Sequence, residues 1–131
     1  NPQHYAIRFA KDQDYEGFYA YEMGIRRQLG YPPYYFTIGI TLSHKKAEEV
    51  IKRAYEVMNI LRSGLSETSH ILGPTPKPIA RTHNLYHYQI LIKYRLEDEL
   101  GPTLNQVLAL TQERENSELR LSIDHEPQQF L

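Results

Sequence analysis

Several cationic or titratable side chains have the chemistry needed to bind phosphate groups. Four of them fall in a proline-rich segment and in the tyrosine-containing apolar run that follows it, and two adjacent arginines lie nearer the N-terminal end. The net charge of the chain is only −1 at pH 7, so any contact with a nucleic acid has to be local. The candidates for phosphate contact are Lys77, Arg81, His87, Lys93, Arg26 and Arg27.

Other kinds of chemistry find little support in the residue pattern. The chain contains neither a G-x-x-x-x-G-K-[ST] phosphate loop nor a G-x-S-x-G nucleophile turn, so ATPase or hydrolase activity is not expected of this segment. It has no cysteine, which excludes disulfides and thiolate zinc sites here and fits the cytoplasm. His83 and His87 fall on an expected hairpin and strand, where their spacing does not direct both at one metal. We therefore expect no catalytic residue, metal or cofactor in this segment.

The proline-rich segment allows two interpretations. Pro74, Pro76 and Pro78 forbid a helix and enforce an extended path. Such a segment could be a polyproline ligand for an aromatic groove. The favoured alternative is a rigid edge strand that cannot accept a foreign strand. In either case it could present Lys77 and Arg81.

Tyr86 and Tyr88 invite comparison with RNA-recognition domains, whose sheets stack bases on aromatic side chains. In a strand, however, both tyrosines point to the same side as Ile90 and Ile92. We therefore expect them to cover the core.

Hydrophobic periodicity places these residues on helices and strands. A first helix is expected from Tyr15 to Leu29, with Asp14 as its cap and Gly30 at its end. Amphipathic spacing predicts two more helices, over residues 45–62 and 100–111. Strands are expected over residues 34–43, 77–82, 85–94 and 119–124.

After the first helix, the order of elements is βαββαβ. Its natural solution is an α+β, ferredoxin-like fold, a four-stranded sheet with both helices on one face. Right-handed crossovers give the strand order 4-1-3-2. The open face of this sheet is expected to carry Tyr35, Thr37, Thr41, His87, Gln89, Lys93, Arg120 and Ser122.

Four segments are distinctive in their composition and order. They are Phe18 to Arg27 with Tyr31-Pro32-Pro33, Leu72-Gly73-Pro74 to Ile79-Ala80-Arg81, Tyr86-His87-Tyr88-Gln89, and Ser122-Ile123-Asp124-His125-Glu126-Pro127. Together they cover nearly the whole chain, and they resemble the C-terminal domain of the PriA family of primosomal replication-restart DNA helicases.

The resemblance implies a parent that is an ATP-dependent DNA helicase acting at stalled forks, with ATP, magnesium and zinc sites upstream of this segment. It implies that residues 1–30 are the tail of the second motor lobe and that residues 31–131 are the C-terminal domain. In that family, the domain helps to bind single-stranded or forked DNA. The resemblance also implies other primosome proteins as partners, a location in the bacterial cytoplasm and no association with a membrane. Without a motor lobe, the apolar side of the first helix, with Phe18 and Ile25, is expected to pack on a neighbouring chain or to be poorly ordered.

The family domain also helps to form a pocket for the acidic tail of single-strand DNA-binding protein. The positions that match the basic residue and the amide of that pocket are Glu97 and Gly101 in this chain. An acidic tail would meet like charges at Glu97, Asp98 and Glu99, which disfavours association. A tail would need other cations, among which Arg95, Lys93 and Arg81 are candidates.

Two functions from different classes remain open. One is a module that binds DNA and partner proteins, and the other is a packing module whose polar sheet face docks on the motor lobes. Ligand-binding regulatory domains and acylphosphatase-like enzymes share the fold class, but the arginine-containing anion loop of the latter is missing. Salt-dependent binding of an oligonucleotide would favour the first function.

Overall fold

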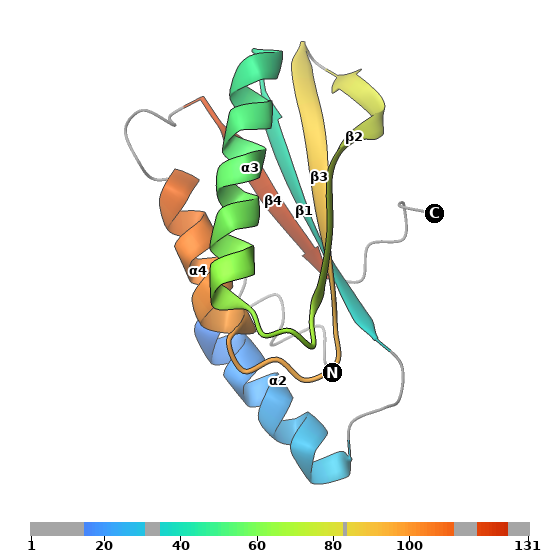
Figure 1. The fold of residues 1–131 in the computed structure, drawn as a ribbon, viewed down its shortest axis with the longest axis vertical. Helices are drawn as coiled ribbons and strands as arrows, with labels where there is room; N and C mark the ends of the chain where they lie inside the picture. The colour runs from blue at the N-terminus through green and yellow to red at the C-terminus, as the bar shows by residue number, and fades with distance from the viewer. Residues whose placement is uncertain (1–14, 31–34, 83, 112–117, 126–131) are drawn as a thin grey trace.

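The computed structural model describes residues 15–30, 35–82, 84–111 and 118–125, with the backbone alone for residues 78–82. It forms an α+β fold in which one antiparallel sheet carries helices on one face (Figure 1). The expected Asp14 cap and the Tyr31-Pro32-Pro33 break lie outside the described residues. In the part of the chain that is described, no helix is long and apolar enough to cross a membrane. The elements are α2 (Tyr15–Leu29), β1 (Phe36–His44), α3 (Ala47–Gly64), β2 (His70–Thr82), β3 (Leu85–Tyr94), α4 (Leu100–Thr111) and β4 (Arg120–His125).

The sheet has the strand order β2-β3-β1-β4, which confirms the order expected from right-handed connections. Every neighbouring pair is antiparallel. The register aligns Ile40 of β1 with Ile90 of β3 and with Ile123 of β4. Since cross-strand partners share a face, this register gathers the apolar side chains of three strands on one side.

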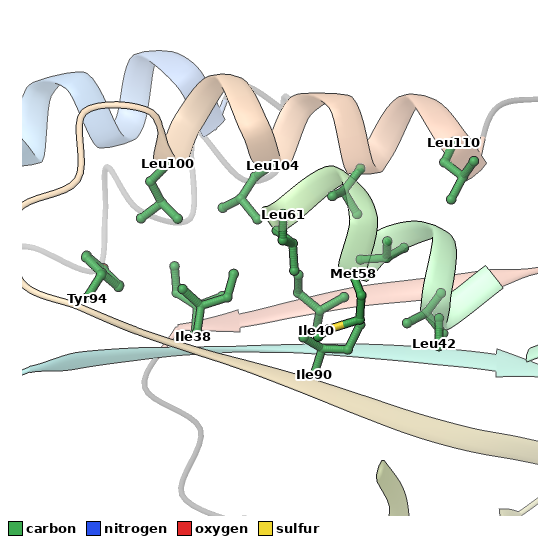
Figure 2. Close-up of a cluster of buried hydrophobic side chains, with 14 of the residues drawn as sticks. Ile38, Ile40, Leu42, Met58, Leu61, Ile90, Tyr94, Leu100, Leu104 and Leu110 are labelled. Carbon is green, nitrogen blue, oxygen red and sulfur yellow. The ribbon is translucent and has the colours of Figure 1, made fainter. Parts of the chain in front are cut away.

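The hydrophobic core lies between that side of the sheet and the helices α3 and α4 (Figure 2). Tyr86 and Tyr88 pack against it as expected, each partly buried. A large apolar side chain that is fully buried stabilises a fold by about 1.5–3 kcal/mol. The buried apolar side chains of this core are therefore the main source of stability. Its central members are Ile38, Ile40, Leu42, Met58, Leu61, Ile90, Ile92, Tyr94, Leu100 and Leu104.

Helix α2 packs within this chain, so the expectation that its apolar side lacks cover is wrong. Phe18, Tyr19 and Met23 are 5%, 2% and 1% exposed and belong to the same core. The helix lies against α4 (Figure 1). The two backbones meet at Gly101, where a Cβ atom would lie 2.5 Å from the Cα atom of Glu16. The absence of a side chain at Gly101 therefore permits the close approach.

Strand β2 begins at His70, seven residues before the start expected from the sequence. It pairs with β3 from His70 to Thr82, with register shifts after Leu72 and after Pro76. A proline lacks the amide donor of a ladder, but an edge strand needs donors on one side only. The edge position and the register shifts thus accommodate the prolines, and they confirm the edge-strand interpretation.

The helix-free face of the sheet is less open than expected at its centre. Thr41 and Gln89 are each 7% exposed, and Ser43 beside them is 8% exposed. They lie on the two inner strands, where each is flanked by neighbours on both sides. Arg120 and Ser122 on the edge strand β4 are exposed, as expected.

Candidate functional site

A pocket of about 350 Å³ opens where β1 begins and β3 ends. Tyr35 precedes β1, His70 starts β2, and Arg95 follows directly after β3. The loop between α3 and β2 supplies another part of the wall. We call this space the sheet-end pocket, and its lining residues are Tyr35, Glu67, Thr68, His70, Arg95 and Leu96.

Tyr35 is the centre of the interactions in this pocket. Its hydroxyl lies 3.3 Å from Nε2 of His70, within hydrogen-bond distance, and the two rings meet edge to face at 5.4 Å. The Arg95 guanidinium lies 5.5 Å from the centroid of the Tyr35 ring, which is cation–π range. Lys93 is the register partner of His70, so it shares the face of the sheet on which His70 lies. We call these four residues, Tyr35, His70, Lys93 and Arg95, the sheet-end cluster.

Glu97 holds the loop that forms one wall of the pocket. It is 2% exposed. Its Oε1 atom accepts hydrogen bonds from the Ser66 amide at 3.0 Å, the Ser66 hydroxyl at 2.7 Å and the Ser69 hydroxyl at 2.6 Å. Its Oε2 atom accepts one from the Glu99 amide at 3.3 Å. The Glu97 carboxylate, which the sequence analysis expected to repel an acidic tail, is therefore buried and hydrogen-bonded within the protein.

The other residues of the expected tail pocket also have internal roles. Gly101 faces the backbone of α2, as described above. Asp98 forms an ion pair with Arg27 on the surface. Arg95, by contrast, lines the sheet-end pocket.

The adjacent arginines of α2 differ sharply in their surroundings. Arg26 is 7% exposed, donates to the Arg95 carbonyl at 3.1 Å and pairs with Glu22 at 3.2 Å. Its guanidinium also lies 3.7 Å from the centroid of the Phe36 ring. Arg27 is exposed, and its hydrogen bond with Asp98 raises the pKa of the guanidinium. Arg26 thus fixes α2 to the end of the sheet and has little surface for a ligand.

The remaining sequence candidates lie apart from one another. Lys77 and Arg81 lie within the edge strand β2. In the strand register, Arg81 is opposite Tyr86, near the β2–β3 turn. The side chain of Arg81 lies outside the described residues. His87 is bound through Nδ1 to the Ser43 hydroxyl at 2.6 Å. Lys93 lies toward the other end of β3. Of the DNA-binding candidates, only Lys93 therefore belongs to the sheet-end cluster.

The sequence pattern placed Tyr35 on the open face but did not indicate its contacts with His70 and Arg95, and it did not indicate His70 at all. Its expected strand began too late, at residue 77, to bring His70 beside Lys93. One sequence signal could have indicated the cluster: Tyr35 directly precedes β1 and Arg95 directly follows β3, so an antiparallel pairing of these strands brings the two residues together. Among the described residues, no group of three or more His, Asp or Glu side chains could hold a metal ion.

Comparisons with known proteins show the family of this chain. The family model of the primosomal protein N C-terminal domain matches residues 27–128. The replication restart protein PriA of Bacillus subtilis is 37% identical over 131 residues, covering 99% of this chain and 16% of that protein. The protein of the same name from Borreliella burgdorferi is 29% identical over 130 residues, which are 97% of this chain and 19% of the relative. The chain thus spans less than a fifth of either relative.

A de novo designed protein shares the fold, with a TM-score of 0.51 and 10% identity over 69% of this chain and 96% of the designed one. At that identity the likeness concerns the fold alone. The match to the family model extends over most of the sequence and includes β1 to β4 and both core helices. The chain belongs to the PriA C-terminal domain family of replication restart proteins.

Proposed function

We propose that this chain is the DNA-binding C-terminal domain of an ATP-dependent replication-restart helicase, and that it contacts single-stranded DNA through the sheet-end cluster. The observation that carries the proposal is the grouping of Tyr35, His70, Lys93 and Arg95 at one end of the sheet. Proteins that bind single strands combine cations for the backbone with aromatic side chains for the bases. This cluster offers both within one surface.

The charge balance favours a weak and local contact. The net charge of −1 provides no overall basic excess, so a contact through the sheet-end cluster would neutralise only a few phosphates. Few phosphate contacts give sequence-independent binding in the micromolar range or weaker. The proposal assigns ATP hydrolysis, magnesium and zinc to parts of the parent protein outside this chain.

The two positions that match the family's tail pocket, Glu97 and Gly101, are not expected to bind a partner-protein tail in this chain. Glu97 and Gly101 are both committed to contacts within the chain. A tail from single-strand DNA-binding protein would therefore need cations elsewhere in the chain.

The test is a titration of a labelled single-stranded oligonucleotide with the 131-residue chain at several salt concentrations. Each lost phosphate contact lowers the slope of log affinity against log salt by about one. The double variant Lys93→Ala, Arg95→Ala should bind more weakly and with a smaller slope. Lys52→Ala is the matched control, because Lys52 is an exposed cation on α3. Arg81→Ala tests one of the two candidates on β2, and an unchanged slope in the double variant would contradict the proposed surface.

A packing module is the second candidate. In this role the polar face of the sheet, on which Arg120 and Ser122 are exposed, would dock on another part of the parent protein. Absence of salt-dependent binding in the same titration would favour this role over DNA binding.

A further inference from the structure

We infer that the sheet-end pocket accepts one unstacked nucleobase that carries an exocyclic amino group, stacked on Tyr35 and hydrogen-bonded to the Glu67 carboxylate. This inference rests on the proposed DNA-binding function and specifies its ligand at the level of the base.

The size and lining of the pocket suit one flat, amphipathic group. Its volume of about 350 Å³ lies at the lower end of the range of about 300–1,000 Å³ typical of small-molecule sites. Tyr35 and Leu96 supply apolar surface, whereas Glu67, Thr68, His70 and Arg95 supply polar groups. A nucleobase needs the same combination, an apolar contact for its faces and polar partners for its edge.

Tyr35 is positioned to act as the stacking platform. Tyr35 is 43% exposed, so part of its surface remains for a ligand. Its hydroxyl is within hydrogen-bond distance of His70, and its ring lies in cation–π range of Arg95. Because these contacts already restrain the ring, binding a base costs less side-chain entropy than ordering a free tyrosine would.

Glu67 determines which group can enter the pocket. A carboxylate only accepts hydrogen bonds, so it repels a phosphate and favours an amino group. Cytosine offers its N4 amino group and adenine its N6 amino group, whereas thymine presents the O4 acceptor instead. Lys93 and Arg95 provide the positive charge that the sugar-phosphate backbone requires at the edge of the same site. The base would thus lie in the pocket and the phosphates at its rim.

Glu97 acts as a positioning residue for Glu67. Ser66 and Ser69 flank the wall residues Glu67 and Thr68, and both serines donate to the same Glu97 oxygen. The wall is therefore held from both of its ends by one buried carboxylate. Such preorganisation is what a site that discriminates between bases requires.

An acidic peptide is the competing occupant, and the charges disfavour it. Its carboxylates would approach Glu67, which lines the pocket. Like charges brought together in this way weaken binding and slow the encounter. A base carries no such charge on its edge.

The experiment compares oligo(dC), oligo(dT) and an abasic sugar-phosphate oligomer, each of about eight units. Their binding to the 131-residue chain is measured by fluorescence anisotropy at pH 7 and fixed salt. Base stacking on an aromatic side chain predicts that oligo(dC) binds about tenfold more tightly than the abasic oligomer. The amino group of cytosine predicts that oligo(dC) also binds more tightly than oligo(dT), by about threefold or more.

The variants separate stacking from hydrogen bonding. Tyr35→Ala should remove the advantage of both base-containing oligomers, and Tyr35→Phe should retain most of it because the ring remains. Glu67→Gln should abolish the preference for oligo(dC) over oligo(dT), since a carboxamide both donates and accepts, while the stacking advantage persists. Tyr55→Ala, at an exposed tyrosine of α3, is the control that should change none of the three affinities.

Each contrary outcome has a distinct meaning. Equal, salt-dependent binding of the three oligomers would overturn the base pocket and leave the DNA-binding function in place. No binding of any oligomer would overturn both. Binding of an acidic peptide that is tight and lost in Tyr35→Ala would assign the pocket to a protein partner and overturn the inference.

Discussion

At the scale of single residues, Arg26 and Glu97 are charged side chains that act inside the protein. Each looks from the sequence like a surface charge on a helix or at its start. In the fold, Arg26 donates to a carbonyl 69 residues away, and Glu97 accepts from an amide 31 residues away. No local pattern encodes such distant partners. A buried charge of this kind is tolerated because its hydrogen bonds replace those with water.

Replacing Glu97 should therefore destabilise the chain more than it alters its surface. Glu97→Ala leaves the donors of Ser66, Ser69 and Glu99 without their acceptor, and we expect the free energy of unfolding to fall by about 3 kcal/mol. Glu99→Ala is the matched control, because Glu99 is exposed and its loss should change stability by less than about 0.5 kcal/mol. Urea unfolding of the three proteins measures both values. Equal stability of the Glu97 and Glu99 variants would contradict the loop-holding role.

The candidate site could be predicted from the sequence only in part. Lys93 was identified because it lies at a polar position of a clear strand. Tyr35 and His70 became neighbours of Lys93 and Arg95 only through the register of three strands, which single-strand periodicity does not determine.

At the scale of elements, the sequence predicted the bounds correctly for helices and strands with a strong hydrophobic periodicity. The bounds of β3 and α4 agree with the sequence expectation, and so does the strand order. Strand β2 was underestimated because its start carries prolines and a glycine in place of alternating apolar residues. Gly73 there has a φ of 109°, and a Cβ atom would lie 2.8 Å from the carbonyl oxygen of Gln89. The burial of α2 was missed because an amphipathic helix does not reveal which partner covers it.

The packing of α2 on α4 predicts opposite effects for two glycine substitutions. Gly101→Ala places its Cβ atom 2.5 Å from the Cα atom of Glu16 and 2.7 Å from the Tyr15 carbonyl oxygen. Since backbone atoms cannot give way locally, α2 must shift, and we expect a loss of about 1–3 kcal/mol in the free energy of unfolding. Gly24→Ala is the matched control within α2, where no atom lies within 4 Å of the new Cβ atom. It should stabilise the helix by up to about 1 kcal/mol.

Thermal or urea unfolding of both glycine variants measures these effects, and limited proteolysis of α2 reports its displacement. A Gly101→Ala protein as stable as Gly24→Ala would show that the two helices do not depend on this close approach.

At the scale of the whole molecule, α2, α4 and the sheet share one hydrophobic core. Tyr19 of α2 meets Tyr94 of β3 edge to face, with ring centroids 6.4 Å apart. The family match begins at residue 27, near the end of α2. The division between a motor-lobe tail at residues 1–30 and a C-terminal domain at residues 31–131 stays a prediction. The described contacts tie α2 to the second of these parts.

Truncation to residues 31–131 tests how far that domain is independent of α2. The deletion removes Phe18, Tyr19 and Met23 from the core, and each fully buried side chain of this size contributes about 1.5–3 kcal/mol. We therefore expect the free energy of unfolding to drop by several kcal/mol in urea titrations, with earlier and less cooperative unfolding. In the full chain, Met23→Ala should cost about 2–5 kcal/mol, whereas Tyr21→Ala, at an exposed position of the same helix, should cost little. If residues 31–131 unfold with the stability of the full chain, α2 contributes no core energy and the boundary at residue 30 is correct. A large loss would instead make α2 a structural part of the C-terminal domain.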